Sequence, residues 1–252
     1  MPKINKERIL VVVAHPDDEV LGCGATVAWH AKRGDRVAVA FMADGVTSRY
    51  YNPERKLSRA EELSLAQKDI LRRRQEAGKA AAILGVREED LFFMNFADQR
   101  LDTYTFLDLI KRIEIVKSSF APKKIFTHFW NDLNLDHQIV CRAVLTAFRP
   151  VTGLDYVPVY QMEIPETTLL SVPCQGKDFL PDQFVDAYST LALKIRALKA
   201  YESEGRLAPH PRSEEYIRSL AYQRGREAGL KAAEAFQTSF VSDKKRLARR
   251  LK

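Results

Sequence analysis

Two short segments of the chain concentrate side chains that can bind a metal ion or move a proton. The first, residues 14–19, reads Ala-His-Pro-Asp-Asp-Glu, so that one histidine and three acids fall within five positions. An acidic cap on a following helix would account for one of these carboxylates, but not for all of these side chains together. Carboxylates this close repel one another unless a cation or protons compensate them. The segment therefore indicates a site for a cation or for proton transfer.

The second segment, residues 127–137, reads Thr-His-Phe-Trp-Asn-Asp-Leu-Asn-Leu-Asp-His and again collects histidine and aspartate. One aspartate with two histidines leaves an open coordination position for water, which is the usual arrangement of a catalytic mononuclear zinc site. Either segment alone would be a weak signal. Together they predict one metal centre.

Both segments follow short apolar runs that are typical of buried strands. Such runs occur at residues 8–14, 36–42, 91–94 and 124–127. Between them the sequence predicts helices over residues 19–33, 58–84, 106–116 and 136–148, the second with a Ser58–Glu61 capping box. Strands that alternate with helices indicate a mostly parallel sheet covered on both faces. In such folds functional groups gather at the carboxyl ends of the strands, where both segments lie.

The pattern changes after residue 150. We expect a strand over 156–164, a Pro-containing stretch over 165–181, helices around 191–198 and 213–229, and a last strand over 234–240. The predicted fold class is α/β, a Rossmann-like three-layer α/β/α architecture with a mostly parallel sheet and a C-terminal α+β elaboration. We expect one domain over residues 1–252, which comprises a catalytic core (1–150), the elaboration (151–243) and a basic tail (244–252).

Composition narrows the class of protein. Hydrophobic residues make up 46% and charged residues 29% of the 252 residues, as in ordinary globular chains. No apolar run approaches the length of about 20 residues that a membrane helix needs, and no signal-type segment begins the chain. The three cysteines, Cys23, Cys141 and Cys174, are widely spaced, which argues against a disulfide scaffold. We expect a cytoplasmic protein with no transmembrane segment.

The net charge of +7 does not indicate a nucleic-acid partner, because the charge is local. Residues 244–252 hold six basic residues and no acid, and the remaining 34 basic residues nearly balance 33 acidic ones. A short basic end of this kind is typically solvated. We therefore expect no nucleic acid among the partners. The oligomeric state stays open, and a homo-oligomer is compatible with the sequence.

The first motif resembles a known family. His15-Pro16-Asp17-Asp18-Glu19, followed by Leu21-Gly22 and Gly24, is similar to the AHPDDE segment of the PIG-L (LmbE-like) zinc-dependent N-deacetylases. Asp136-His137 matches the end of that family's second motif, commonly HPDH. The resemblance covers roughly residues 8–148 and fades beyond them.

The resemblance implies roles for the motif residues. His15, Asp18 and His137 would bind the metal, with Zn²⁺ expected and another divalent ion as the alternative. Asp17 would be the general base that takes a proton from the metal-bound water, whose pKa the zinc lowers. Asp136 is placed with the catalytic residues. The implied reaction is hydrolysis that removes an N-acetyl group from an amino-sugar-containing substrate.

The sequence departs from the family pattern at Asn134, where many members have the first histidine of the second motif. That histidine is credited with stabilising the oxyanion or supplying a proton. Asn134 can donate a hydrogen bond but cannot shuttle a proton. Three alternatives stay open: Asp17 performs both proton transfers, His128 takes the role, or His210 does.

Substrate contacts are expected mainly from residues after the strands. Arg73, with Glu76 three residues on, resembles an arginine of the family that faces the sugar, and Asp98 resembles an aspartate that holds sugar hydroxyls. Asp44 and Arg49 follow the second strand and would line the same cleft. A surface ion pair for Arg73 and a turn position for Asp98 are the structural alternatives. The remaining candidates are an aromatic floor for a sugar ring and a histidine in a predicted turn: Phe129, Trp130 and His210.

Two other functions stay open. An amidase with the same metal site could act on a thiol-, lipid- or nucleotide-linked glycan conjugate. A non-catalytic module could bind a glycan or a nucleotide, although the intact first motif argues against it. A dinucleotide site is disfavoured, because Gly22 and Gly24 do not complete GxGxxG and the neighbouring acids would repel pyrophosphate.

Overall fold

The computed structural model describes residues 6–55, 57–151, 156–170 and 178–240. Cys174 and the basic tail at 244–252 lie outside these ranges. The strands in chain order are β1 Arg8–Val13, β2 Arg36–Ala43, β3 Leu91–Phe96, β4 Lys124–His128, β5 Val159–Met162, β6 Gln183–Asp186 and β7 Ala233–Phe240. The helices are α1 Asp18–Lys32, α2 Arg59–Leu84, α3 Phe106–Phe120, α4 Leu135–Ala147, α5 Leu191–Ala200 and α6 Glu214–Glu227.

The described strands form one sheet in the order β3-β2-β1-β4-β5-β7-β6. The first five pair in parallel, and β7 runs antiparallel to both β5 and β6. The strand order reverses between β1 and β4, which is where α/β folds place their ligands. The predicted mostly parallel α/β fold is confirmed.

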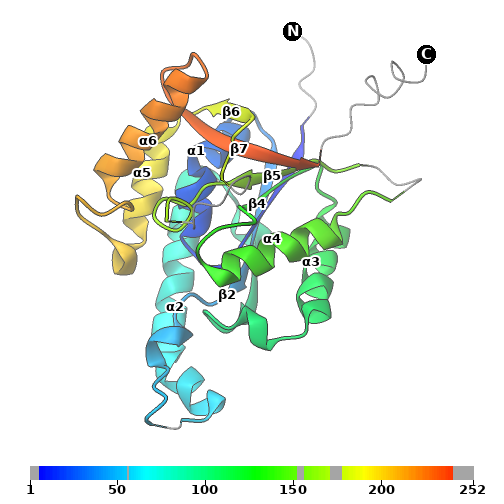
Figure 1. Ribbon diagram of the computed structural model, residues 1–252, viewed down its shortest axis with the longest axis vertical. Coiled ribbons are helices and arrows are strands. Elements are labelled where there is room, and N and C mark those ends of the chain that lie inside the picture. The colour runs from blue at the N-terminus through cyan, green and yellow to red at the C-terminus, as the bar shows by residue number, and fades with distance from the viewer. Residues whose placement is uncertain (1–5, 56, 152–155, 171–177, 241–252) are drawn as a thin grey trace.

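Helices cover both faces of the sheet. On one face α1, α2 and α5 pack over inward-facing side chains of the sheet such as Val11 and Phe41. On the other face α3 and α4 pack over Leu10, Val12 and their neighbours. Figure 1 shows the two groups on opposite sides of the sheet, with α6 beside α5. Because β1 and β2 are buried on both faces beyond their first residue, they read as continuous apolar runs rather than as alternating ones.

Local signals explain most of the helix boundaries. Ser58 accepts from the backbone N–H of Glu61, whose carboxylate accepts from Ser58, so the predicted capping box is present. Gly85 closes α2 in the left-handed conformation at φ 85°. Thr105 caps α3 by accepting from Asp108.

The C-terminal prediction needs two corrections. The strand expected over 156–164 is limited to β5, Val159–Met162. The edge strand β6 was not predicted, because four residues with a polar residue at each end carry little strand signal. Both β6 and β7 extend the sheet of the catalytic core. No helix among the described residues combines the length and the apolar character needed to cross a membrane.

Candidate metal centre and active site

The carboxyl ends of β1 and β4 bring three predicted ligands together. One side-chain donor atom from each of His15, Asp18 and His137 lies within 4.8 Å of the others, and all three residues are buried. The Oδ2 atom of Asp18 lies 3.4 Å from Nδ1 of His15 and 3.3 Å from Nε2 of His137. Two imidazole nitrogens and one carboxylate form a donor set that suits zinc with an open coordination position.

Carboxylates hold the opposite nitrogen of each imidazole. Nε2 of His15 lies 3.0 Å from Asp98 Oδ1 and 3.1 Å from Asp136 Oδ2. Nδ1 of His137 lies 3.1 Å from Asp132 Oδ1. A carboxylate behind a ligating histidine fixes the ring and its tautomer, and leaves the other nitrogen's lone pair for the metal.

The residues present fit a cation by their own chemistry. Among the described side chains, Nε2 of His137 is one of few buried polar atoms that make no hydrogen bond. Burial lowers the pKa of both rings, but the surrounding carboxylates outweigh it, so that the pKa of His15 is raised and that of His137 reaches about 9. Burial likewise opposes charge on Asp18, yet the neighbouring His137 holds the pKa of Asp18 well below its usual range. This site therefore favours positive charge.

Two other groups could also hold an ion by proximity. Asp98 and Asp136 face the far side of His15, but they are already engaged, since Asp136 accepts from the backbone of Gln99 and Leu101 and Asp98 accepts from Ser48. The second group is Glu7, His30 and Asp35, of which Glu7 is exposed. Glu7 and Asp35 precede β1 and β2, so this group lies away from the carboxyl ends of the strands.

Asp17 lies at the first turn of α1 beside the ligand set. Its φ of 124° belongs to a region that non-glycine residues rarely adopt. The backbone N–H of Asp17 donates to Glu19 Oε2 at 3.0 Å, and the carbonyl of Pro16 accepts from Arg73 at 3.0 Å. Burial raises the pKa of Asp17 to about 6, while Arg212 opposes that shift. A carboxyl group with this pKa can accept a proton near neutral pH and release it again.

A polar cavity of about 270 Å³ opens in front of these residues. Its lining includes seven predicted site residues: His15, Asp17, Arg49, Arg73, Asp98, Asn134 and His210. The structure thus brings together residues that follow four different strands and one that follows α5. Asn134 caps α4, since its side-chain oxygen accepts from Asp136 at 2.9 Å.

Arg73 is more enclosed than a sugar-facing arginine would be. Its side chain is 4% exposed and donates to the carbonyl of Pro16 and to Glu204. Glu204 also binds Arg49 at 2.5 Å, and the guanidinium of Arg49 is 45% exposed. Arg73 therefore anchors the segment next to Asp17, whereas Arg49 stands at the mouth of the cavity.

Among the predicted residues that do not line this cavity are Asp18, His137 and Asp136, which belong to the ligand set or contact it, and three others, His128, Asp44 and Trp130. His128 is fully buried, stacks on His137 with ring centroids 3.9 Å apart, and accepts from Ala14 N–H through Nε2 at 2.8 Å. Burial lowers the pKa of His128 to about 3, so this ring is a neutral packing group behind the predicted ligand His137. Asp44 turns back to accept from Val46 and Thr47.

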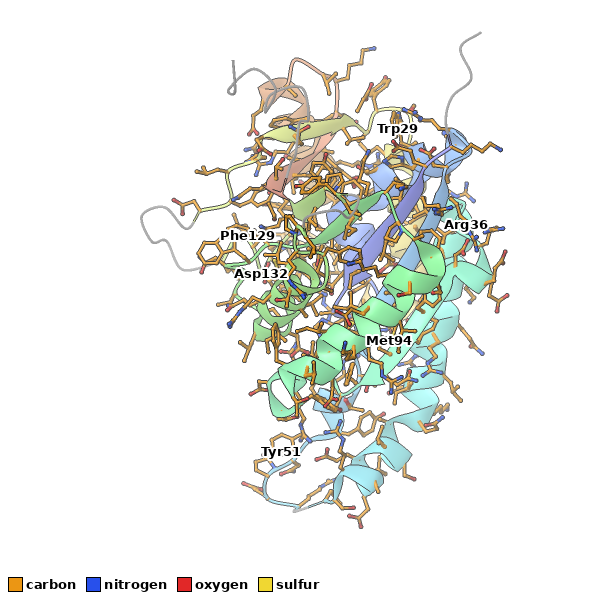
Figure 2. The ribbon with its side chains drawn as sticks, turned by 90° about the vertical axis from the view of Figure 1, so that its right-hand side faces the viewer. Trp29, Arg36, Tyr51, Met94, Phe129 and Asp132 are labelled. Carbon is orange, nitrogen blue, oxygen red and sulfur yellow. The ribbon has the colours of Figure 1, made fainter. Side chains whose placement is uncertain are left out.

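Trp130 is the third, and its backbone N–H donates to Gln161. Its neighbour Phe129 is fully buried and packs against Phe179, so the proposed aromatic floor lies away from the cavity. In Figure 2, Phe129 and Asp132 lie close together in the turn after β4.

Sequence reasoning did not single out several residues that the structure places at the site, among them Arg212, Glu166 and Asp132. Arg212 donates to Asp17 Oδ2 at 3.1 Å and pairs with Glu166 at 2.6 Å, and all three line the cavity. Asp132 holds His137. The sequence signal for Asp132 was its place in the second segment. Arg212 follows His210 by two positions, but nothing in the local sequence links Arg212 to Asp17, which lies almost two hundred positions earlier.

The fold and donor set define a metal-dependent hydrolase site at the switch point of an α/β sheet. The chain matches the PIG-L family, described as GlcNAc-PI de-N-acetylase, over residues 10–148. The chain belongs to this family, and it is an N-deacetylase by class.

Similar proteins agree on the fold and vary in reaction. The chain is 27% identical over 206 residues to YaiS, an uncharacterised deacetylase of Escherichia coli K12. The matched region covers 79% of this chain and 93% of YaiS. N,N'-diacetylchitobiose deacetylase from Pyrococcus horikoshii superposes with a TM-score of 0.71 at 19% identity, and the match covers 96% of this chain and 89% of that one. GalB, the 4-carboxy-2-hydroxymuconate hydratase from Pseudomonas putida KT2440, superposes with a TM-score of 0.68 at 24% identity, and the match covers 94% of this chain and 98% of that one. Since a hydratase shares the fold, the reaction must be argued from the site.

Proposed function

We propose that this protein removes the N-acetyl group from an amino-sugar-containing substrate, with His15, Asp18 and His137 as the ligands of a zinc ion. The observation that carries the proposal is the buried donor set with Asp17 beside it in a polar cavity. When bound, zinc supplies a Lewis acid that polarises the acetamide carbonyl and lowers the pKa of water.

The remaining chemistry falls to side chains of this chain. Asp17 accepts the proton of the attacking water at its carboxylate and returns a proton to the leaving amine. Arg212 fixes the orientation of that carboxylate through its 3.1 Å contact with Oδ2. The amide group of Asn134 can donate to the developing oxyanion but cannot supply a proton. Three residues are candidates for the acid that gives a proton to the leaving amine. The buried position of His128 argues against His128 in this role and favours Asp17 or His210.

Substrate binding is assigned to the polar walls. Arg49 is the half-exposed donor at the mouth, and Asp98 is an acceptor shared between Ser48 and His15. Glu204, Arg206, His210 and Arg212 reach the cavity from the C-terminal elaboration. Their presence supports a single catalytic domain rather than a core with a free appendage. We also propose a cytoplasmic location, which the buried free thiols of Cys23 and Cys141 support.

A second candidate substrate is favoured by a specific feature. A larger cavity of about 870 Å³ adjoins the polar one and shares Glu204, Arg206 and Arg212 with it. Its wall includes Ile195, Leu198 and Leu207. Among the conjugates that the sequence left open, this cavity favours a substrate whose amino sugar is linked to an apolar group.

Amine release from a panel of N-acetyl sugars tests the proposal, with each sugar offered free and as an alkyl glycoside. We expect release that stops with a chelator, returns with zinc and is lost in Asp17→Asn. A preference for the alkyl glycosides would support the second candidate. Release that survives removal of all metal, or that is undiminished in Asp17→Asn, would refute the mechanism.

A further inference from the structure

Helix α1, which carries the ligand Asp18, is interrupted one turn after it begins. Cys23 has φ −145° and ψ 22°, whereas the rest of α1 is helical. The break separates a short segment, residues 18–22, from a longer one, residues 24–32. Breaks of this kind arise where a side chain enters the ladder of backbone hydrogen bonds.

A buried ion pair occupies the break. The ammonium group of Lys194 on α5 donates to the carbonyl of Leu21 at 2.8 Å. The carboxylate of Glu234 on β7 accepts from the backbone N–H of Ala25 at 3.0 Å and of Thr26 at 2.7 Å. Lys194 and Glu234 pair with each other at 2.6 Å, and each residue is 5% exposed.

The pairing replaces a helical bond with two charged ones. In an unbroken helix the N–H of Ala25 would donate to the carbonyl of Leu21, four residues earlier. Here the two groups bond to Glu234 and Lys194 instead. The charges also suit the helix ends that meet at the break, since a cation lies at the end of the first segment and an anion at the start of the second.

The two glycines beside the break give room for this arrangement. A Cβ on Gly24 would lie 3.2 Å from Cγ of Lys194, and a Cβ on Gly22 would lie 2.5 Å from Sδ of Met162 on β5. Helix α5, which supplies Lys194, packs against α1 (Figure 1). The Leu21-Gly22-Cys23-Gly24 stretch thus has a packing role in place of the dinucleotide site considered from the sequence.

We propose that Lys194 and Glu234 are positioning residues: by holding the break in α1 they set the direction of residues 18–22 and so place Asp18 against His15 and His137. The inference rests on the proposed function in that the placed group is a metal ligand. It assigns the C-terminal elaboration a part in building the metal centre, because both residues lie in it.

The double variant Lys194→Met, Glu234→Gln tests the pair without leaving an unpaired buried charge. Zinc affinity is measured by competition with a chromophoric chelator, and the Cα chemical shift of Cys23 is measured in the metal-free protein. We expect the shift to move towards the helical value and zinc affinity to fall about tenfold, the lower end of the range for groups that support metal ligands. If the double variant does not fold, Glu234→Asp keeps the charges of the pair balanced but shortens the reach of the carboxylate to the N–H groups of Ala25 and Thr26, and a smaller loss of zinc affinity is expected.

Lys199→Met is the matched control. Lys199 lies on the same helix in an exposed ion pair with Glu214. We expect it to leave both measurements unchanged. If the double variant has a lower free energy of unfolding but unchanged zinc affinity, or an unchanged Cys23 chemical shift, the positioning role is overturned. A wild-type chain that binds no zinc would refute the proposed function instead, and the Cys23 shift would still decide whether the pair holds the break.

Discussion

The link between Asp132 and His137 predicts a measurable loss of zinc affinity when the charge of Asp132 is removed. The carboxylate of Asp132 accepts from Asn134 N–H at 2.9 Å, from Thr168 Oγ1 at 2.5 Å and from Thr167 Oγ1 at 3.1 Å, and it faces His137 Nδ1 at 3.1 Å. Burial opposes its charge, but the contact with His137 keeps the pKa of Asp132 below its ordinary value. The carboxylate is thus fixed from several sides and charged.

In Asp132→Asn the side chain keeps its shape and can still accept from the His137 ring, so the tautomer is preserved while the negative charge is lost. Groups behind a ligating histidine contribute about 10- to 100-fold to metal affinity. The conservative change falls at the lower end, about tenfold or 1.4 kcal/mol. Asp132→Ala also removes the acceptor, and we expect its loss to approach 100-fold.

Chelator competition measures both variants, and Asp182→Asn is the control. Asp182 also accepts from a backbone N–H and a threonine hydroxyl, both of Thr238, but it is exposed and outside the site. We expect wild-type affinity for Asp182→Asn. Wild-type affinity for both Asp132 variants would refute the assignment of His137 Nε2 as the metal-facing nitrogen.

Four further predictions follow from the geometry. Asp17→Asn should retain zinc and lose about 10²- to 10⁴-fold in kcat, and loss of zinc would instead make Asp17 a ligand. Asn134→His should raise kcat if the site lacks an acid, and should lower the free energy of unfolding by about 1 kcal/mol because the cap on Asp136 N–H is removed. Gly225→Ala should lower the free energy of unfolding by about 1–3 kcal/mol, because the added Cβ would lie 2.7 Å from the backbone of Ala232. Gly78→Ala should raise it by about 0.5–1 kcal/mol, because a Cβ there would meet nothing within 4 Å. Urea unfolding measures both changes. Burial lowers the pKa of His30 in the folded state, so the folded state binds fewer protons than the unfolded state and the free energy of unfolding decreases as pH falls below about 6.5. Urea unfolding at pH 7.5 and 5.5 should therefore show the wild type losing stability relative to His30→Gln. Equal losses of stability in the two proteins would contradict this prediction.

The three proposed metal ligands were named from two short motifs that resemble those of the family, and the structure brings these residues together. His15 and Asp18 lie in one turn after β1, and His137 begins a helix after β4, so the strand order alone brings them together. Apolar runs and helix caps likewise predicted the core strands and helices. These features depend on neighbouring residues, which a sequence displays directly.

Contacts that depend on packing or on side-chain direction were not predictable. Arg212 reaches Asp17 only because α5 packs against α1 and α2, which brings the segment after α5 to the start of α1. Asp44 follows β2 as expected, but its carboxylate turns back onto its own loop in an Asx-type turn. His128 ends β4 and is fully buried, so its ring stacks on that of His137 instead of lining the cavity.

Zinc stoichiometry by native mass spectrometry tests the central claim most directly, with the wild type compared with His137→Ala after both are equilibrated with zinc. The geometry predicts about one zinc per wild-type chain and little or none on His137→Ala, because two of the three ligands alone bind weakly. Equal zinc on both proteins would contradict the ligand role of His137. No zinc on the wild type under these conditions would contradict the metal centre itself.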